Sequence, residues 1–72
     1  MEYKNIEDFI FHLKNGQGTD DVIKIDGCEY VMDYYDMEGM FIHYRDAMQN
    51  LLEIKTSDRY KNGFGDATVT LY

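Results

Sequence analysis

The dipeptide Asp26-Gly27 constrains the fold more than any other feature, because it separates two short runs of strand-forming residues. A two-residue type I′ turn needs positive φ at both central positions, and Asp followed by Gly accepts this conformation well. The pattern therefore predicts a β-hairpin from residues 22–25 and 28–32. The short turn also fixes the register, which places Ile25 opposite Cys28, Lys24 opposite Glu29, Ile23 opposite Tyr30 and Val22 opposite Val31.

This register sorts the hairpin side chains onto two faces, because successive residues of a strand point to opposite sides. The face expected to pack against the core carries Ile23, Ile25, Cys28, Tyr30, Met32 and, as the alternation continues, Tyr34. The opposite face carries Lys24, Glu29, Asp33 and Tyr35. The opposite charges of Lys24 and Glu29 favour this register.

Residues 5–15 have the pattern of an amphipathic helix. Asn5 is a good N-cap residue, and Asp8 three positions later completes a weaker form of the capping box. Gly16 is typical of a helix C-terminus. The apolar stripe, spaced at i, i+3, i+4 and i+7, consists of Ile6, Phe9, Ile10 and Leu13. Phe11 lies off this stripe.

The rest of the chain gives weaker signals. Residues 40–45 alternate as a strand but also fit a helix, and we favour a third strand. Asp46 with Gln49 suggests the start of a second helix, which would direct Met48, Leu51 and Leu52 to the core. A loop over 57–65 and a terminal strand over 67–72 complete a single domain, 1–72. The predicted fold class is α+β: an N-terminal helix, an antiparallel hairpin or three-stranded sheet, a second helix and a short C-terminal strand.

Composition indicates the cellular compartment and the class of protein. The chain has 72 residues, of which 44% are hydrophobic, so a small globular domain is expected. Cys28 is the single cysteine, which excludes an intramolecular disulfide and favours a reducing, cytoplasmic location. No apolar run approaches the ~20 residues of a membrane span, and the N-terminal residues lack a signal-peptide pattern.

No catalytic, metal or cofactor site is predicted. His12 and His43 lack partners at metal-ligand spacing, and Cys28 falls on the expected core face. Calcium-loop alignments on Gly39 and on Gly63 place the wrong residues at the ligand positions. The only serine, Ser57, lies in the predicted loop, so no nucleophilic arrangement can be argued. We therefore expect a protein that is not an enzyme and needs no cofactor.

Negative charge is concentrated in one part of the chain. The net charge is −7, and residues 20–46 contain eight acids and two bases. This balance argues against direct nucleic-acid binding and for a basic protein surface as partner. The alternative is that the acids only keep a small protein soluble. The predicted partner-binding residues are the acids and interleaved anchors Asp20, Asp21, Glu29, Asp33, Tyr35, Asp36, Met37 and Glu38.

Two stretches carry a resemblance to a known group of proteins. Asn5–Ile10 with Lys14-Asn15, and Gly27–Val31, resemble parts of a phage-encoded anti-CRISPR protein that inhibits Cas9. The stretches cover under a quarter of the chain, and this chain lacks the acidic C-terminal helix. The resemblance implies an inhibitor that mimics DNA on the nucleic-acid-binding surface of a CRISPR nuclease, or of another nucleic-acid enzyme, in the bacterial host cytoplasm.

A second function remains open beside the inhibitor. The same residues suit a general protein-interaction or regulatory module that binds through its tyrosine and methionine side chains or through a strand edge. A self-complementary strand edge would also allow a homodimer.

Overall fold

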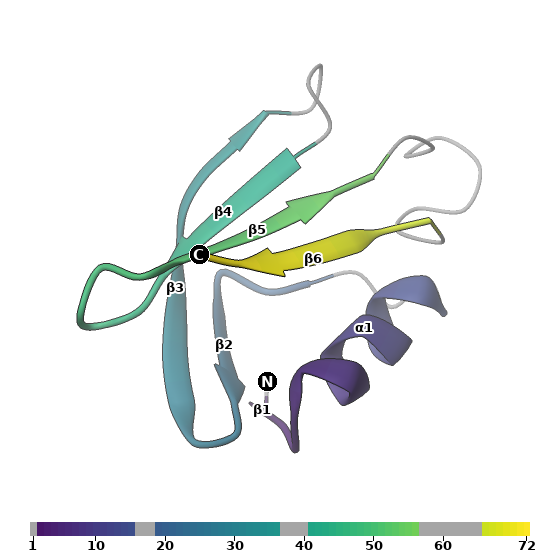
Figure 1. Cartoon of the computed structure of the whole chain (residues 1–72), viewed down its shortest axis with the longest axis horizontal. Helices are drawn as coiled ribbons and strands as arrows, with labels where there is room; N and C mark the ends of the chain where they lie inside the picture. The colour runs from purple at the N-terminus through teal and green to yellow at the C-terminus, as the bar shows by residue number, and fades with distance from the viewer. Residues whose placement is uncertain (1, 16–18, 37–40, 57–65) are drawn as a thin grey trace.

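A computed structural model describes residues 2–15, 19–36, 41–56 and 66–72. Its main element is a six-stranded sheet whose strands lie in chain order. The strands are β1 (Glu2–Tyr3), β2 (Val22–Ile25), β3 (Cys28–Asp36), β4 (Phe41–Arg45), β5 (Leu51–Lys55) and β6 (Thr68–Leu71). β1 pairs with β2 in parallel, and the other neighbours are antiparallel. The sheet curls around one helix, α1 (Ile6–Lys14), as Figure 1 shows.

The predicted two-helix α+β fold is wrong, because the structure is mostly β and the expected second helix is a turn followed by β5. The Asp46 carboxylate accepts hydrogen bonds from the backbone N–H groups of Met48 and Asn50 and closes a tight turn. Gln49 adopts φ 67, which ends any helical path at that point. A capping pattern was therefore mistaken for a helix start when it belongs to a β-turn. The short strand β1 was not predicted.

The first helix is confirmed. The Asn5 side chain accepts a hydrogen bond from the Asp8 backbone N–H at 2.8 Å, as the capping pattern predicts. Phe9 and Leu13 of the apolar stripe are fully buried, whereas Phe11 is 64% exposed. The predicted end at Gly16 lies outside the described residues. The helix thus covers the concave side of the sheet with one apolar face (Figure 1).

The hairpin of β2 and β3 is also confirmed, with the predicted register at all four pairs. Asp26 and Gly27 have φ of 51 and 78, so both central residues adopt the left-handed conformation that a type I′ turn requires. A side chain other than glycine would be strained at position 27.

The predicted faces of β3 hold only as far as Met32. The pairing with β4 shifts between Met32 and Tyr34, so the strand carries a β-bulge there. After the bulge Tyr34 lies opposite His43, and Tyr35 lies opposite the buried Ile42. Tyr34 is therefore on the outer face and 53% exposed, which contradicts the expected core position.

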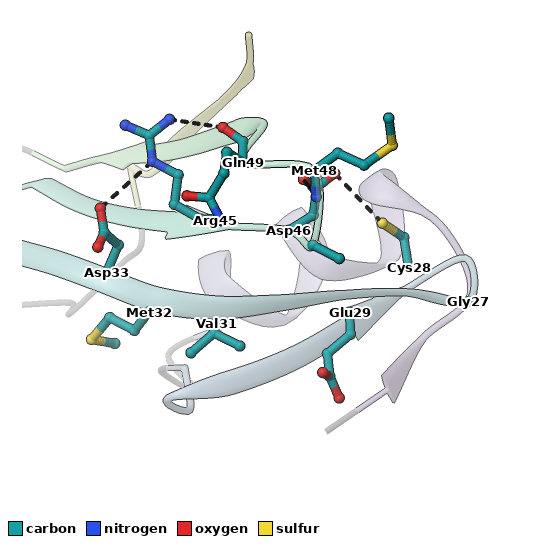
Figure 2. A pocket seen from close by; sticks show the side chains of 11 residues that line it. Gly27, Cys28, Glu29, Val31, Met32, Asp33, Arg45, Asp46, Met48 and Gln49 are labelled. Carbon is teal, nitrogen blue, oxygen red and sulfur yellow. Dashed lines mark hydrogen bonds and ion pairs between the residues drawn. The ribbon is translucent and has the colours of Figure 1, made fainter.

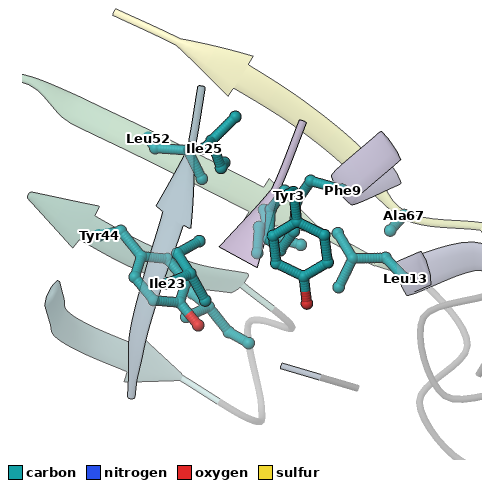
Figure 3. Close-up of a cluster of buried hydrophobic side chains, with 10 residues drawn as sticks. Tyr3, Phe9, Leu13, Ile23, Ile25, Tyr44, Leu52 and Ala67 are labelled. Atoms are coloured by element: carbon teal, nitrogen blue, oxygen red, sulfur yellow. The ribbon is translucent and has the colours of Figure 1, made fainter. Parts of the chain in front are cut away.

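The third and last strands are confirmed as β4 and β6, although Met40 and the loop predicted over 57–65 lie outside the described residues. The core fills the space between the curled sheet and α1 (Figure 3). Its largest fully buried side chains are Tyr44, Phe9, Leu13, Ile23, Leu52 and Ile54. Among the described residues no helix is long and apolar enough to cross a membrane.

Candidate interaction surface

The predicted partner-binding residues fall on or next to one strand. Asp20 and Asp21 precede β2, and Glu29, Asp33, Tyr35 and Asp36 belong to β3. Met37 and Glu38 lie outside the described residues. We call Asp20, Asp21, Glu29, Asp33 and Asp36 the acidic rim. Four of these five side chains are exposed and Asp36 is partly buried, so the rim is a feature of the surface.

Backbone hydrogen bonds fix the first part of the acidic rim. The Met32 N–H donates to the Asp21 carbonyl at 2.7 Å, which extends the β2–β3 ladder and brings Asp21 beside the bulge at Asp33. The Tyr44 hydroxyl donates to the Asp20 carbonyl at 2.5 Å. Both contacts use main-chain oxygens, so the two carboxylates are left at the exposed surface.

Two cations offset part of this negative charge. Arg45 Nε lies 3.5 Å from the Asp33 carboxylate, and the two side chains are 37% and 56% exposed. Lys24 is the register partner of Glu29. Exposed ion pairs of this kind contribute little to folding stability, commonly less than about 1 kcal/mol. Asp33 and Glu29 therefore remain accessible to competing cations of a partner protein.

An aromatic cluster lies on the same outer face, and sequence reasoning missed it. Tyr34 of β3 and Phe41 and His43 of β4 form it, with ring centroids 4.9 to 6.2 Å apart. We call these three residues the outer aromatic cluster. In the strand predicted over 40–45, Phe41 and His43 fall on one face by alternation, but no sequence pattern indicates the bulge that brings Tyr34 beside them. Asp36 lies opposite Phe41 in the register, so the cluster adjoins the acidic rim.

Glu53 of β5 borders the outer aromatic cluster. His43 Nε2 lies 2.8 Å from one carboxylate oxygen, and the Tyr72 hydroxyl donates to the other at 3.0 Å. These hydrogen bonds, with the one from His43 as the largest cause, lower the pKa of Glu53 from its ordinary value. The bond to Glu53 in turn raises the pKa of Tyr72. Glu53 is thus held as a carboxylate at neutral pH.

A cleft of about 640 Å³ lies between the β2–β3 turn and the β4–β5 turn. Figure 2 shows Cys28 directed toward Asp46, with the thiol sulfur 3.9 Å from a carboxylate oxygen. Arg45 reaches across to Asp33 and to the Gln49 carbonyl in the same view. The described residues that line the cleft include no histidine that could act as a base toward the thiol.

The described surface offers apolar side chains and charged groups that can contact another molecule. Within the described ranges no three His, Cys, Asp or Glu side chains are grouped to hold a metal ion. Exposed apolar side chains extend the outer face beyond the aromatic cluster, since Val22 and Val31 are paired across β2 and β3 and are 44% and 47% exposed. No protein-family model, curated protein or solved structure matches this chain.

Proposed function

We propose that this chain is a protein-binding domain that docks the outer face of β3 and β4 against a basic surface of a partner protein. The observation that carries the proposal is that β3 presents acids and apolar side chains together: Glu29, Val31, Tyr34 and Asp36 share its outer face. Aromatic side chains are common anchors at interfaces, and surrounding charges steer the partner and raise the association rate. Nothing in this role requires catalysis.

The narrower form of the proposal is an inhibitor. A partner whose basic surface binds nucleic acid would lose access to its substrate while this domain is bound, which is how a DNA-mimicking anti-CRISPR protein acts on a bacterial defence nuclease. The concentration of charge in residues 20–46 and the two resembling stretches support this form. The first experiment is affinity capture from a bacterial lysate at low and high salt, followed by competition with nucleic acid for the captured protein.

Two pairs of charge-removing variants test whether the acidic rim itself, rather than the net charge of the chain, is responsible for binding. Asp21→Asn with Glu29→Gln removes two charges from the acidic rim, and Glu2→Gln with Glu7→Gln removes two charges from exposed positions in β1 and α1. We expect the first pair to slow association on the order of ten-fold, and the second to have a much smaller effect. Equal losses from the two pairs would show that only net charge matters, and binding unaffected by nucleic acid would rule out the inhibitor.

A general interaction module is the second candidate, and the exposed aromatic cluster favours it. Tyr34 and Tyr35 are neighbours of similar exposure, 53% and 58%, but lie on opposite faces of β3. If the aromatic cluster is the main anchor, Tyr34→Ala lowers affinity on the order of thirty-fold while Tyr35→Ala and the rim variants have little effect. A larger loss from Tyr35→Ala would place the contact on the other face.

A further inference from the structure

Among the described residues β1 and β6 are the edge strands of the sheet, and they differ in how they are protected against pairing with another strand. β1 has two residues, which is too short to template a partner. The part of β3 beyond β2 carries the bulge and the charged residues Asp33 and Asp36. Bulges, charges and short length are the devices by which sheets avoid edge pairing. β6 has neither a bulge nor a charged residue: it is a regular four-residue strand, twice as long as β1, of sequence Thr-Val-Thr-Leu.

The hydrogen-bond pattern identifies which backbone groups of β6 point to its open side. The Tyr72 N–H donates to the Leu51 carbonyl at 2.9 Å, so residues 68, 70 and 72 direct their backbone groups toward β5. The N–H and C=O groups of Val69 and Leu71 therefore face away from β5. Leu71 is 54% and Tyr72 is 68% exposed, so this end of the strand is accessible.

We propose that β6 pairs with β6 of a second copy of this chain, antiparallel and around a two-fold axis at Thr70. In this register Val69 and Leu71 of one chain exchange hydrogen bonds with Leu71 and Val69 of the other. Thr70 then faces its own symmetry mate in a pair without hydrogen bonds, and Thr68 faces Tyr72. Cross-strand pairs of Thr with Thr and of Thr with an aromatic residue are favourable. The result is one continuous sheet through both copies.

Charge supports a second copy as the occupant. Residues 67–72 contain no Asp, Glu, Lys or Arg, and β4 and β5 separate β6 from the acidic strand β3. The two acidic rims would therefore lie at opposite ends of the joined sheet, where repulsion between two chains of charge −7 is weakest. Salt should strengthen this dimer, because it screens the remaining repulsion. Binding of a basic partner should weaken with salt instead, so the two proposals can fail separately.

The mass of the unmodified chain in solution is the first test. Analytical ultracentrifugation at high salt should give about twice the 8.5 kDa of one chain, and the dimer fraction should fall at low salt. Leu71→Pro removes an outward N–H without touching the bonds to β5, so it should give a folded monomer by circular dichroism. Leu71→Ala keeps that N–H and should still dimerise. A monomeric mass for the unmodified chain at high salt and high concentration would overturn the proposal.

Disulfide cross-linking tests the register. In a Cys28→Ala background, Thr70→Cys places two thiols directly opposite each other across the axis, where a disulfide can form. Thr68→Cys is the matched control, since it is exposed on the same face of the same strand but lies about 13 Å from its symmetry mate. We expect at least several-fold more cross-linked dimer from Thr70→Cys. Equal cross-linking from both variants would show random collision and reject the register.

Discussion

The sheet contains similar antiparallel pairings near its two ends, β2 with β3 and β5 with β6, but these two regions carry different surfaces. At one end β2 and β3 pair through a two-residue turn and are lined by acids, with Asp20, Asp21, Glu29 and Asp33 exposed. At the other end β6 pairs with β5 and residues 67–72 lack Asp, Glu, Lys and Arg. The comparison shows that strand pairing alone does not determine what a sheet end can bind. The short strand β1, the bulge and the charges of β3 protect the first end from other strands, whereas the strand β6 at the second end has neither a bulge nor a charge.

The burial of apolar side chains also differs between these two regions of the sheet. Truncating one side chain in each region to alanine measures the difference in stability. Ile23 of β2 is fully buried against α1 and the sheet, whereas Leu71 of β6 is 54% exposed. We expect Ile23→Ala to lower the free energy of unfolding by about 2–5 kcal/mol, and Leu71→Ala by less than about 1 kcal/mol. Urea denaturation at low protein concentration measures both. Equal losses would show that the β6 end is as tightly packed as the β2 end.

Tyr44 links the acidic end to the middle of the sheet. Its buried hydroxyl donates to the Asp20 carbonyl, so Tyr44→Phe leaves that carbonyl without its partner and should cost about 1–2 kcal/mol. Burial raises the pKa of Tyr44 to about 12. The hydroxyl therefore stabilises the fold below pH 10.0, and this contribution is lost as pH rises toward about 12.

Unfolding curves recorded from pH 10.0 to about 12 test whether the Tyr44 hydroxyl stabilises the fold in this way. The unmodified chain should lose stability more steeply than Tyr44→Phe does, because the variant has no hydroxyl to ionise. Parallel curves for the two proteins would contradict the assignment of the raised pKa to Tyr44.

Glu53 lies in β5, next to β6, and accepts hydrogen bonds from His43 and Tyr72. Of the substitutions considered, its replacement should have the smallest effect on stability. Because its pKa is lowered from 4.5, the carboxylate stabilises the fold above that pH, and the contribution is lost as pH falls through the lowered value. Glu53→Gln should therefore flatten the loss of stability in acid. Tyr72→Phe removes one of the hydrogen bonds and should flatten it less. Thermal unfolding from neutral to acid pH measures both, and an unchanged acid profile for Glu53→Gln would refute this role.

Local sequence predicted those parts of the fold in which neighbouring residues determine the conformation. The capping of α1 by Asn5 and the hairpin turn at Asp26-Gly27 depend on contacts within a few residues, and both are confirmed. The segment after Asp46 was misread because the same carboxylate can cap a helix or close a turn. The choice is made by Leu52 and Ile54, whose alternation fits burial on a sheet that only exists once β4 is in place.

The candidate site was predicted only in part, because local features are visible in the sequence and pairing between strands is not. Charge is visible in sequence, so the members of the acidic rim could be named, and the structure shows that Asp21 bonds to Met32, the residue before Asp33. The outer aromatic cluster depends on pairing between strands. No local pattern revealed that the strand shifts at Asp33, and so Tyr34 was assigned to the core and Tyr35 to the surface.

The bulge after Met32 has a consequence for how this chain can change over generations. It shifts the side-chain alternation of β3 by half a period, so residues before it follow one pattern of inside and outside and residues after it follow the reverse. Substitutions at Tyr34 and Asp36 would alter what the outer face presents without altering the core positions at Ile23 and Ile25. Loss of Asp33, the extra residue, would leave Tyr34 outward and Tyr35 inward, because the strand would then alternate regularly from Met32. The bulge therefore lets β3 carry one more residue without changing which side chains either face presents.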